Sequence, residues 1–580
     1  MTESSSPPAS PPERHVLRAL LGLLLVLPAA VACGLTLLAP SLTMVGMSFE
    51  RVSALHPRDS IPVGLANYTQ LGRLLDGSGA VSMTLLVTGV RLAALLVIPA
   101  LLALGLSRAL PALRLGARLL LTVPAALFAP ALALIAWVSG LRPDPSPAGV
   151  RASLLLAEAV ISLTVGCAVL TPIYLAAMSV PPVGASARPI PWRPLAVIWL
   201  VSLLAVIALT PQGLVTSLVT QGGPLHITEN MMLLIYRQAF VNFQFGVASA
   251  LSTVLLAQVM PIGLFAGALL VWSGVGLHTT ASPQPAPDPA ARTRLVLIGL
   301  LTLAPALACA GLAGLPYLLP SQPAGAGELP GQVNLASTLA LTILPPLVGI
   351  FLVQLPLTYL AALGIGALRP FGRYSELLLL PFAPWLFVTV GPLLVSLFIA
   401  ARMAGSLNTP VALLPRFAVS IPILFVLTLF FKGQGARRRA HGGSILRGLI
   451  LPSLPLALLL GFAATLIAAQ GLAWPLIAAS SSNLATLPVL ALEVAGQLTG
   501  SRAALMSVIL PAEGLILIAW LLIFALFQLF YLPRLALARV EPAPAAAPIP
   551  SSQPAAPSSP PVTAASAEPP PADENLVADC

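Results

Sequence analysis

Three ionisable side chains lie within long apolar runs of the sequence and are its first candidates for function. Arg91 falls near the middle of the second run, Glu158 in the upper part of the fourth and Glu513 in the last. A charge at the centre of a bilayer costs about 3 kcal/mol on insertion scales, so such residues face protein or water. Arg91 and Glu158 have opposite charges at similar depth, which predicts either a structural ion pair or a pair lining a translocation path. For Glu513, a pathway carboxylate and a buried, hydrogen-bonded acid both fit the sequence.

Residues for catalysis or cofactor binding form no pattern. The four cysteines and five histidines are scattered, without the spacing of a metal site or a disulfide framework. Lys432 is followed by Gly433, whereas a phosphate-binding loop needs serine or threonine after its lysine. No nucleophile elbow or zinc motif is present. We therefore expect no metal, no cofactor and no enzymatic activity in this chain.

The composition is that of a helical membrane protein. Of the 580 residues, 58% are apolar and 8% are charged, and the mean hydropathy is +0.97. A soluble protein carries roughly 25% charged residues, and the strands of a membrane β-barrel would alternate polar and apolar residues. Arginines that anchor cytoplasmic loops explain the net charge of +10 better than nucleic-acid binding does. We expect an all-α polytopic membrane protein that contacts lipid and no nucleic acid.

Apolar runs long enough to cross a bilayer, about 20 residues each, predict about twelve transmembrane helices. Six are expected in a first half, near residues 16–40, 80–106, 117–139, 152–177, 195–211 and 247–273. Six more are expected in a second half, near residues 295–319, 336–364, 375–401, 411–431, 449–470 and 507–532. Most arginines fall in alternate connecting segments, which places both termini in the cytoplasm.

The tails and the middle of the chain differ in composition from the apolar runs. We expect a disordered tail at 1–13, a first half at 14–273 and a second half at 294–540. The proline-rich stretch 274–293 reads as a cytoplasmic linker, and 541–580, rich in proline, alanine and serine, as a disordered tail.

Short motifs recur in a fixed order along both halves. In the first half they are Val63–Tyr68, Gly222–Pro224, Thr228–Glu229, Ile235–Phe240 and Phe245–Ser252. In the second half they are Leu407–Thr409, Trp474–Leu476, Leu487–Pro488, Ala503–Met506, Leu510–Pro511 and Phe527–Tyr531. The first series resembles the first of two permease subunits in carbohydrate-importing ABC transporters of the maltose type, and the second series resembles its partner permease. The resemblance implies that two normally separate permeases are fused in this chain.

The family couples transport to ATP through one cytoplasmic loop per permease, in which a Glu-Ala-Ala stretch is followed by glycine and, further on, Leu-Pro. In the second half, Gly442, Gly443 and Ser444 match the glycine region, and Leu454 and Pro455 match Leu-Pro. In the first half, Gly184, Ala185 and Ser186 match the glycine region, with Arg188 close behind. Neither loop has the acidic residue, and the first also lacks Leu-Pro. The resemblance implies that these loops dock on the ATPase.

Three consecutive arginines stand where the Glu-Ala-Ala stretch should end. Arg437, Arg438 and Arg439 fit an acidic cleft in an unusual ATPase, and they equally fit a role in keeping the loop cytoplasmic or in contacting anionic lipid.

The resemblance implies a permease component of an ABC importer in the cell membrane, moving a carbohydrate or related small solute by alternating access. Two copies of a separate ATPase subunit would hydrolyse ATP, and an extracytoplasmic binding protein would deliver the solute. Two alternatives stay open. An ion-driven secondary transporter fits twelve helices in two halves equally well, and a permease relic that no longer transports fits the altered coupling loops.

Overall fold

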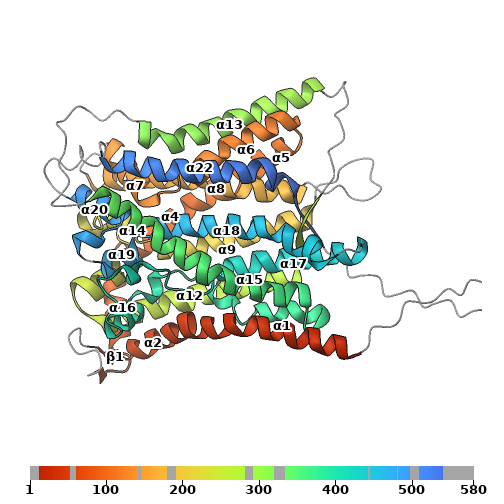
Figure 1. Cartoon of the computed structure of the whole chain (residues 1–580). Coiled ribbons are helices and arrows are strands. Elements are labelled where there is room, and N and C mark those ends of the chain that lie inside the picture. The colour runs from red at the N-terminus through yellow and green to blue at the C-terminus, as the bar shows by residue number, and fades with distance from the viewer. Residues whose placement is uncertain are drawn as a thin grey trace, which may run out of the picture. The chain divides into compact units, whose positions relative to one another are not determined.

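A computed structural model gives the fold and describes residues 12–52, 60–141, 146–178, 191–280, 292–318, 334–441, 444–479, 481–496 and 508–539. Among these residues, nine helices are long and apolar enough to cross a membrane, and one bent pair of helices would make a tenth. The chain is therefore an all-α, multi-pass membrane protein, with helices running side by side (Figure 1). The expected count of twelve is not confirmed.

The first half contains both long spans and short helical segments. They are α1 (Pro12–Cys33), α2 (Ala39–Ser48), α3 (Ala66–Gly77), α4 (Ala80–Leu96), α5 (Ile98–Ser107), α6 (Pro111–Ala126), α7 (Pro130–Leu141), α8 (Pro147–Met178), α9 (Trp192–Leu209), α10 (Val215–Leu218), α11 (Met231–Tyr236) and α12 (Phe245–Trp272). The π-helical turn η1 (Gly34–Leu38) joins α1 to α2, so the first span continues to Ser48.

The second half begins at α13. Its helices are α13 (Arg292–Leu318), α14 (Leu335–Gly349), α15 (Leu355–Leu363), α16 (Leu394–Met403), α17 (Ile421–His441), α18 (Leu451–Ala469), α19 (Ala473–Ala478), α20 (Leu487–Gly496) and α22 (Leu510–Phe530). The π-helical turns η6 (Ile350–Gln354), η7 (Gly364–Leu368) and η12 (Leu446–Ile450) extend α14, α15 and α18.

The third expected span of each half is broken. Within 117–139, α6 and α7 meet at an angle of 86°, close to Pro124 and Pro130. Within 375–401, the single expected helix is wrong, because the chain forms the 3₁₀ segments η8 (Gly372–Leu379), η9 (Ala383–Trp385) and η10 (Gly391–Leu393) before α16. Proline removes a backbone donor and clashes with the preceding turn, so the repeated prolines explain these breaks.

The span expected at 411–431 lies ten residues further on, as α17. The 3₁₀ turn η11 (Pro410–Leu413) occupies the start of the expected range. Pro422 then falls in the first turn of α17, where the missing donor costs nothing. The second part of α17 carries Lys432 and the three arginines. This helix is not among the nine candidate spans.

The first span of each half packs on the other half. Helix α1 contacts α15 and η7, with Gly22 against Gly364 and Pro370. Helix α13 contacts α5, α6 and α8, and Gly299 leaves room for Leu113. Figure 1 shows α1 and α13 on opposite sides of the helices between them. Each half is thus held by a helix from the other.

Two short antiparallel ribbons were not expected from the sequence. Strand β1 (Glu50–Arg51) pairs with β2 (Ile61–Pro62), and β3 (Val275–Thr279) pairs with β4 (Leu535–Arg539). Strand β3 lies in the range expected to be a flexible linker, so the first half extends to residue 279 at least. The proline-rich residues 281–291 lie outside the described residues.

The largest hydrophobic cluster contains residues from both halves. Met44, Ile235 and Leu251 of the first half lie in it with Leu393 and Phe425 of the second. Burial of apolar side chains between the halves therefore stabilises them as one unit.

Candidate functional site

The structure brings Arg91 and Glu158 together. Arg91 Nη2 on α4 lies 2.9 Å from Glu158 Oε2 on α8, and Arg91 Nε donates to the same oxygen at 3.2 Å. The other carboxylate oxygen accepts a hydrogen bond from Thr216 Oγ1 of α10. Glu158 is buried, and both of its oxygens have partners within the first half. Such a satisfied pair favours the structural interpretation over a role in contacting solute.

Glu513 lies fully buried in the first turn of α22. Its Oε1 accepts a hydrogen bond from Gln470 Nε2, at the end of α18. Within the described part of the chain, Glu513 Oε2 and Gln470 Oε1 have no hydrogen-bond partner. The geometry is that of a buried acid with one oxygen still available, which keeps both interpretations of Glu513 open.

The first coupling segment, Gly184, Ala185, Ser186 and Arg188, lies outside the described residues, between α8 and α9. Of the second segment, Gly442 and Gly443 lie outside them. Ser444 is described, and its Oγ accepts a hydrogen bond from the Arg447 backbone at 3.2 Å. Leu454 and Pro455 lie inside α18, one turn after it begins.

The three arginines at the end of α17 have different surroundings. Arg437 donates to the Thr279 carbonyl of β3, so it points to another element of the protein. The stem of Arg438 packs against Gly448 of η12. Burial lowers the pKa of Arg439, and the positive charges of Arg369 and Arg438 lower it further. Like charges held this close create a positive surface that favours an anionic partner.

Sequence reasoning missed the buried ion pair beneath this surface. Lys432 Nζ on α17 lies 2.6 Å from Glu376 Oε2 on η8, and Arg369 Nη2 lies 3.7 Å from Glu376 Oε1. In the sequence, Lys432 served only to exclude a phosphate-binding loop. A lysine inside an apolar run was the available signal, because a buried lysine is almost always paired.

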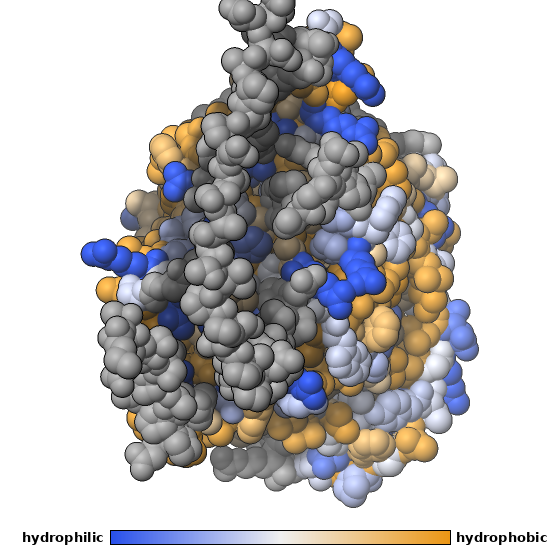
Figure 2. All heavy atoms as spheres, turned by 90° about the vertical axis from the view of Figure 1, so that its right-hand side faces the viewer, coloured by the Kyte–Doolittle hydropathy of each residue, from blue (hydrophilic) through white to orange (hydrophobic). Residues whose placement is uncertain are grey.

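Helix α17 ends, and α1 and α13 begin, at the same end of the protein (Figure 1). Figure 2 faces this end and shows several groups of hydrophilic side chains on it. Leu113 packs against Gly299, so the arginines at the start of α6 and of α13 also lie at one end. This end is the natural place for a polar partner.

The motifs of the first half form packed loops at the start of α12. The Asn67 side chain donates to the Ser48 and Glu50 carbonyls at 2.8 and 3.0 Å, and Gly246 leaves room for it. Glu229 accepts from Arg237, whose other nitrogen donates to the Gln221 carbonyl at 2.6 Å. These motif residues hold loops in place through hydrogen bonds to backbone carbonyls.

Two motifs of the second half also meet in space, whereas Ala503–Met506 lies outside the described residues. The Asn408 backbone donates to the Ala478 carbonyl at 2.8 Å, and Trp474 Nε1 donates to the Ala412 carbonyl at 2.6 Å. Two stretches that are more than sixty residues apart in sequence are thereby joined. As in the first half, the motif positions serve the local fold.

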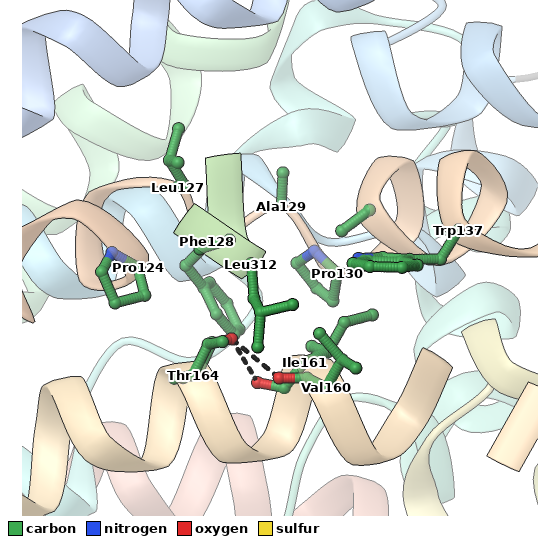
Figure 3. A pocket seen from close by; sticks show the side chains of 13 residues that line it. Pro124, Leu127, Phe128, Ala129, Pro130, Trp137, Val160, Ile161, Thr164 and Leu312 are labelled. Carbon is green, nitrogen blue, oxygen red and sulfur yellow. Dashed lines mark hydrogen bonds between the residues drawn. The ribbon is translucent and has the colours of Figure 1, made fainter. Parts of the chain in front are cut away.

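An apolar pocket lies where α6 bends into α7 (Figure 3). Its empty space measures about 340 Å³, open space at its mouth included, and Phe128, Pro130, Trp137 and Leu312 are among its lining residues. The Thr164 hydroxyl donates back to its own helix, to the Val160 and Ile161 carbonyls. A sugar needs several polar partners, so we do not assign the solute to this pocket.

The described residues contain no group of three or more histidine, cysteine, aspartate or glutamate side chains placed to hold a metal ion. In comparisons with known proteins, no protein-family model and no curated protein matches the chain.

Proposed function

We propose that the chain is the complete membrane-spanning part of an ABC importer, made of two fused permeases. It moves a carbohydrate or related small solute across the cell membrane by alternating access. Two copies of a separate ATPase bind at its cytoplasmic end, and an extracytoplasmic binding protein delivers the solute to the other end. Both termini lie in the cytoplasm, which agrees with the arginines of the connecting segments.

The observation that carries this proposal is the matching order of elements on both sides of the two coupling positions. In the first half, α8 and α9 flank the coupling position, and short helices, the last span α12 and strand β3 follow. In the second half, α17 and α18 flank it, and short helices, the last span α22 and strand β4 follow. Two direct repeats with equivalent loops suit a transporter in which two identical ATPase subunits move one half relative to the other.

The positive surface supports a docking role for the second coupling segment. Arg438 and Arg439 precede Ser444 by a few residues in the sequence. The charge of Arg369 lies close enough to Arg439 to lower its pKa. An ATPase with an acidic cleft would relieve the repulsion between these charges, and so would anionic lipid.

Uptake energetics test the proposal. Membrane vesicles carrying the chain with its native partners are loaded with ATP or given an imposed proton or sodium gradient, and uptake of a panel of labelled sugars is followed. ATP-dependent uptake that vanadate abolishes is expected. Uptake driven by the gradient alone would contradict the proposal.

A secondary transporter is the second candidate, and one observation favours it. Glu513 is fully buried in α22 with one carboxylate oxygen unpartnered among the described residues, as a proton-carrying acid would be. The motif series and the coupling positions favour the importer. A relic without transport activity predicts no uptake under either condition.

A further inference from the structure

The ribbon of β3 and β4 joins the ends of the two halves. The strands follow the last spans α12 and α22, and their register pairs Val275 with Arg539, Leu277 with Leu537 and Thr279 with Leu535. Each strand follows the last span of its half, so the two strands occupy equivalent places in the two halves. Beyond the strands, the Thr280 backbone donates to the Arg534 carbonyl at 2.7 Å.

Strand β3 belongs to the first half but packs on α17 of the second half. The contact is close because Gly433 has no side chain, and a Cβ atom there would overlap the Leu277 backbone. Gln434, which is 7% exposed, accepts hydrogen bonds from the Thr279 backbone and hydroxyl at 3.1 and 3.3 Å. Arg437 donates to the Thr279 carbonyl.

Gln434 also reaches across the second coupling position. Its Nε2 donates to the Gly448 carbonyl of η12 at 3.1 Å. One buried amide therefore connects β3, the helix before the coupling position and the helix after it. A buried side chain on one element that is hydrogen-bonded to two others limits how far the three can move relative to one another.

Strand β4 makes the reciprocal contact. It belongs to the second half but packs on α8 and α9, which flank the first coupling position. Each half thus ends in a strand that lies against the coupling helices of the other half, and the two strands are hydrogen-bonded to each other.

We propose that the β3–β4 ribbon is a clasp that positions the helices flanking the two coupling positions and keeps the two halves in register at their cytoplasmic ends throughout the transport cycle. The role in coupling rests on the proposed function, whereas the mechanical connection does not. A rigid ribbon makes motion imposed at one coupling segment reach the opposite half. Gly433, Gln434 and Arg437 are its positioning residues on α17.

Gly433→Ala and Gly435→Ala form a matched pair to test the clasp. Both replace a glycine of α17 by the better helix former, but only the first overlaps β3, since a Cβ at Gly435 meets nothing closer than Arg439 Nη1 at 3.8 Å. Spin labels at Met178→Cys and Ala440→Cys, in a background without the natural cysteines, report the distance between the ends of α8 and α17. Gly433→Ala should broaden this distance distribution, and Gly435→Ala should not.

Transport gives the second readout. Gly433→Ala should lower ATP-driven uptake about tenfold, the size that coupling residues reach, while the ATPase still copurifies. An unchanged distance distribution and unchanged uptake in Gly433→Ala would overturn the clasp. If no ATPase copurifies with the unaltered chain, the proposed function fails, and the distance measurement alone decides the clasp.

A disulfide across the ribbon covers the case in which Gly433→Ala does not fold. Leu277 and Leu537 lie directly opposite each other, where side-chain carbons are about 5 Å apart. In a background without the natural cysteines, cysteines at both positions, joined by a thiol oxidant that takes up the two hydrogens, lock the clasp. Uptake should persist in the locked protein, because the clasp does not open during transport; loss of uptake on locking, restored by reductant, would overturn the proposal.

Discussion

The pair of Arg91 and Glu158 ties α4 to α8 within the first half, close to the short helix α10. Its charges are both satisfied, and removing one partner leaves the other buried and uncompensated. Arg91→Met and Glu158→Leu should each destabilise the protein by about 3 kcal/mol, and the double variant should recover most of that loss. Thermal unfolding in detergent of the two single variants and the double variant measures this.

The same variants separate structure from transport. If the pair is structural, the double variant should regain uptake together with stability. A stable double variant without uptake would assign the pair to the solute path.

His278 gives the ribbon a predictable response to pH. Burial lowers its pKa, and the positive charge of Arg437 on α17 lowers it further, while its partner on β4, Ala536, is uncharged. As pH falls below about 6.5, the usual pKa of histidine, the unfolded chain takes up a proton that the folded ribbon resists. Stability is therefore full above that pH and declines below it. Unfolding temperatures at pH 7.5 and 5.5 should differ less in His278→Gln than in the unaltered chain; an equal difference would show that His278 does not contribute.

The positive surface at the end of α17 can be tested apart from the clasp. Arg437 bonds β3, so only Arg438 and Arg439 are reversed to glutamate. Repulsion from an acidic cleft should weaken ATPase binding at least severalfold in a detergent pull-down. The control reverses Arg18 and Arg294, two exposed arginines at the start of α1 and α13. Equal binding by both variants would remove Arg438 and Arg439 from the docking site.

Among the elements, long uniform helices could be predicted and broken ones could not. The apolar runs near 80–106, 152–177 and 247–273 match α4–α5, α8 and α12 within a few residues. Over 375–401 the same hydropathy conceals three 3₁₀ segments, two of which contain proline, because apolar content does not reveal whether the backbone stays helical. The β3–β4 ribbon joins residues about 260 apart in sequence. No local pattern could pair them.

Some side-chain contacts of the candidate site could be predicted from the sequence and others could not, again because hydropathy identifies helices but not their neighbours. Arg91 and Glu158 could be paired by depth and charge, since each lies alone in a long span. The partners of Glu513 and Lys432 depend on which helices are neighbours, and hydropathy does not determine that. Gln434 lies among charged residues at a helix end, and nothing in the sequence indicates that this amide is buried or which elements it binds.

The packing of α13 against α8 predicts a disulfide between natural cysteines. Cys167 and Cys309 are buried and free, and their thiols lie close to each other across the two halves. Copper phenanthroline should join them by removing two electrons and two protons. With a protease site placed within 281–291, the cleaved halves should then run as one band without reductant and as two with it.

Cys167→Ser provides the control for this crosslink and should give two bands under both conditions. Two bands from the oxidised, unaltered chain would contradict the placement of α13 on the first half.

At the scale of the whole molecule, each half contacts the other through its first span and its last strand. Each first span packs on the other half, and each last strand lies against the other half's coupling helices. Residues 541–580, which are rich in proline, alanine and serine, lie outside the described residues. Their removal should leave uptake and unfolding temperature unchanged, because no apolar core is touched. Lost uptake at normal expression would assign the tail a function.

The stoichiometry of the complex tests the fused-permease account most directly. The tagged chain is purified from its native membranes in mild detergent, and its intact complex is weighed by native mass spectrometry. One chain of 59.6 kDa supplies both halves, so the account predicts one copy of it with two ATPase subunits. A chain that purifies reproducibly and folded but without any ATPase, or two copies of it around a pair of ATPases, would contradict the account.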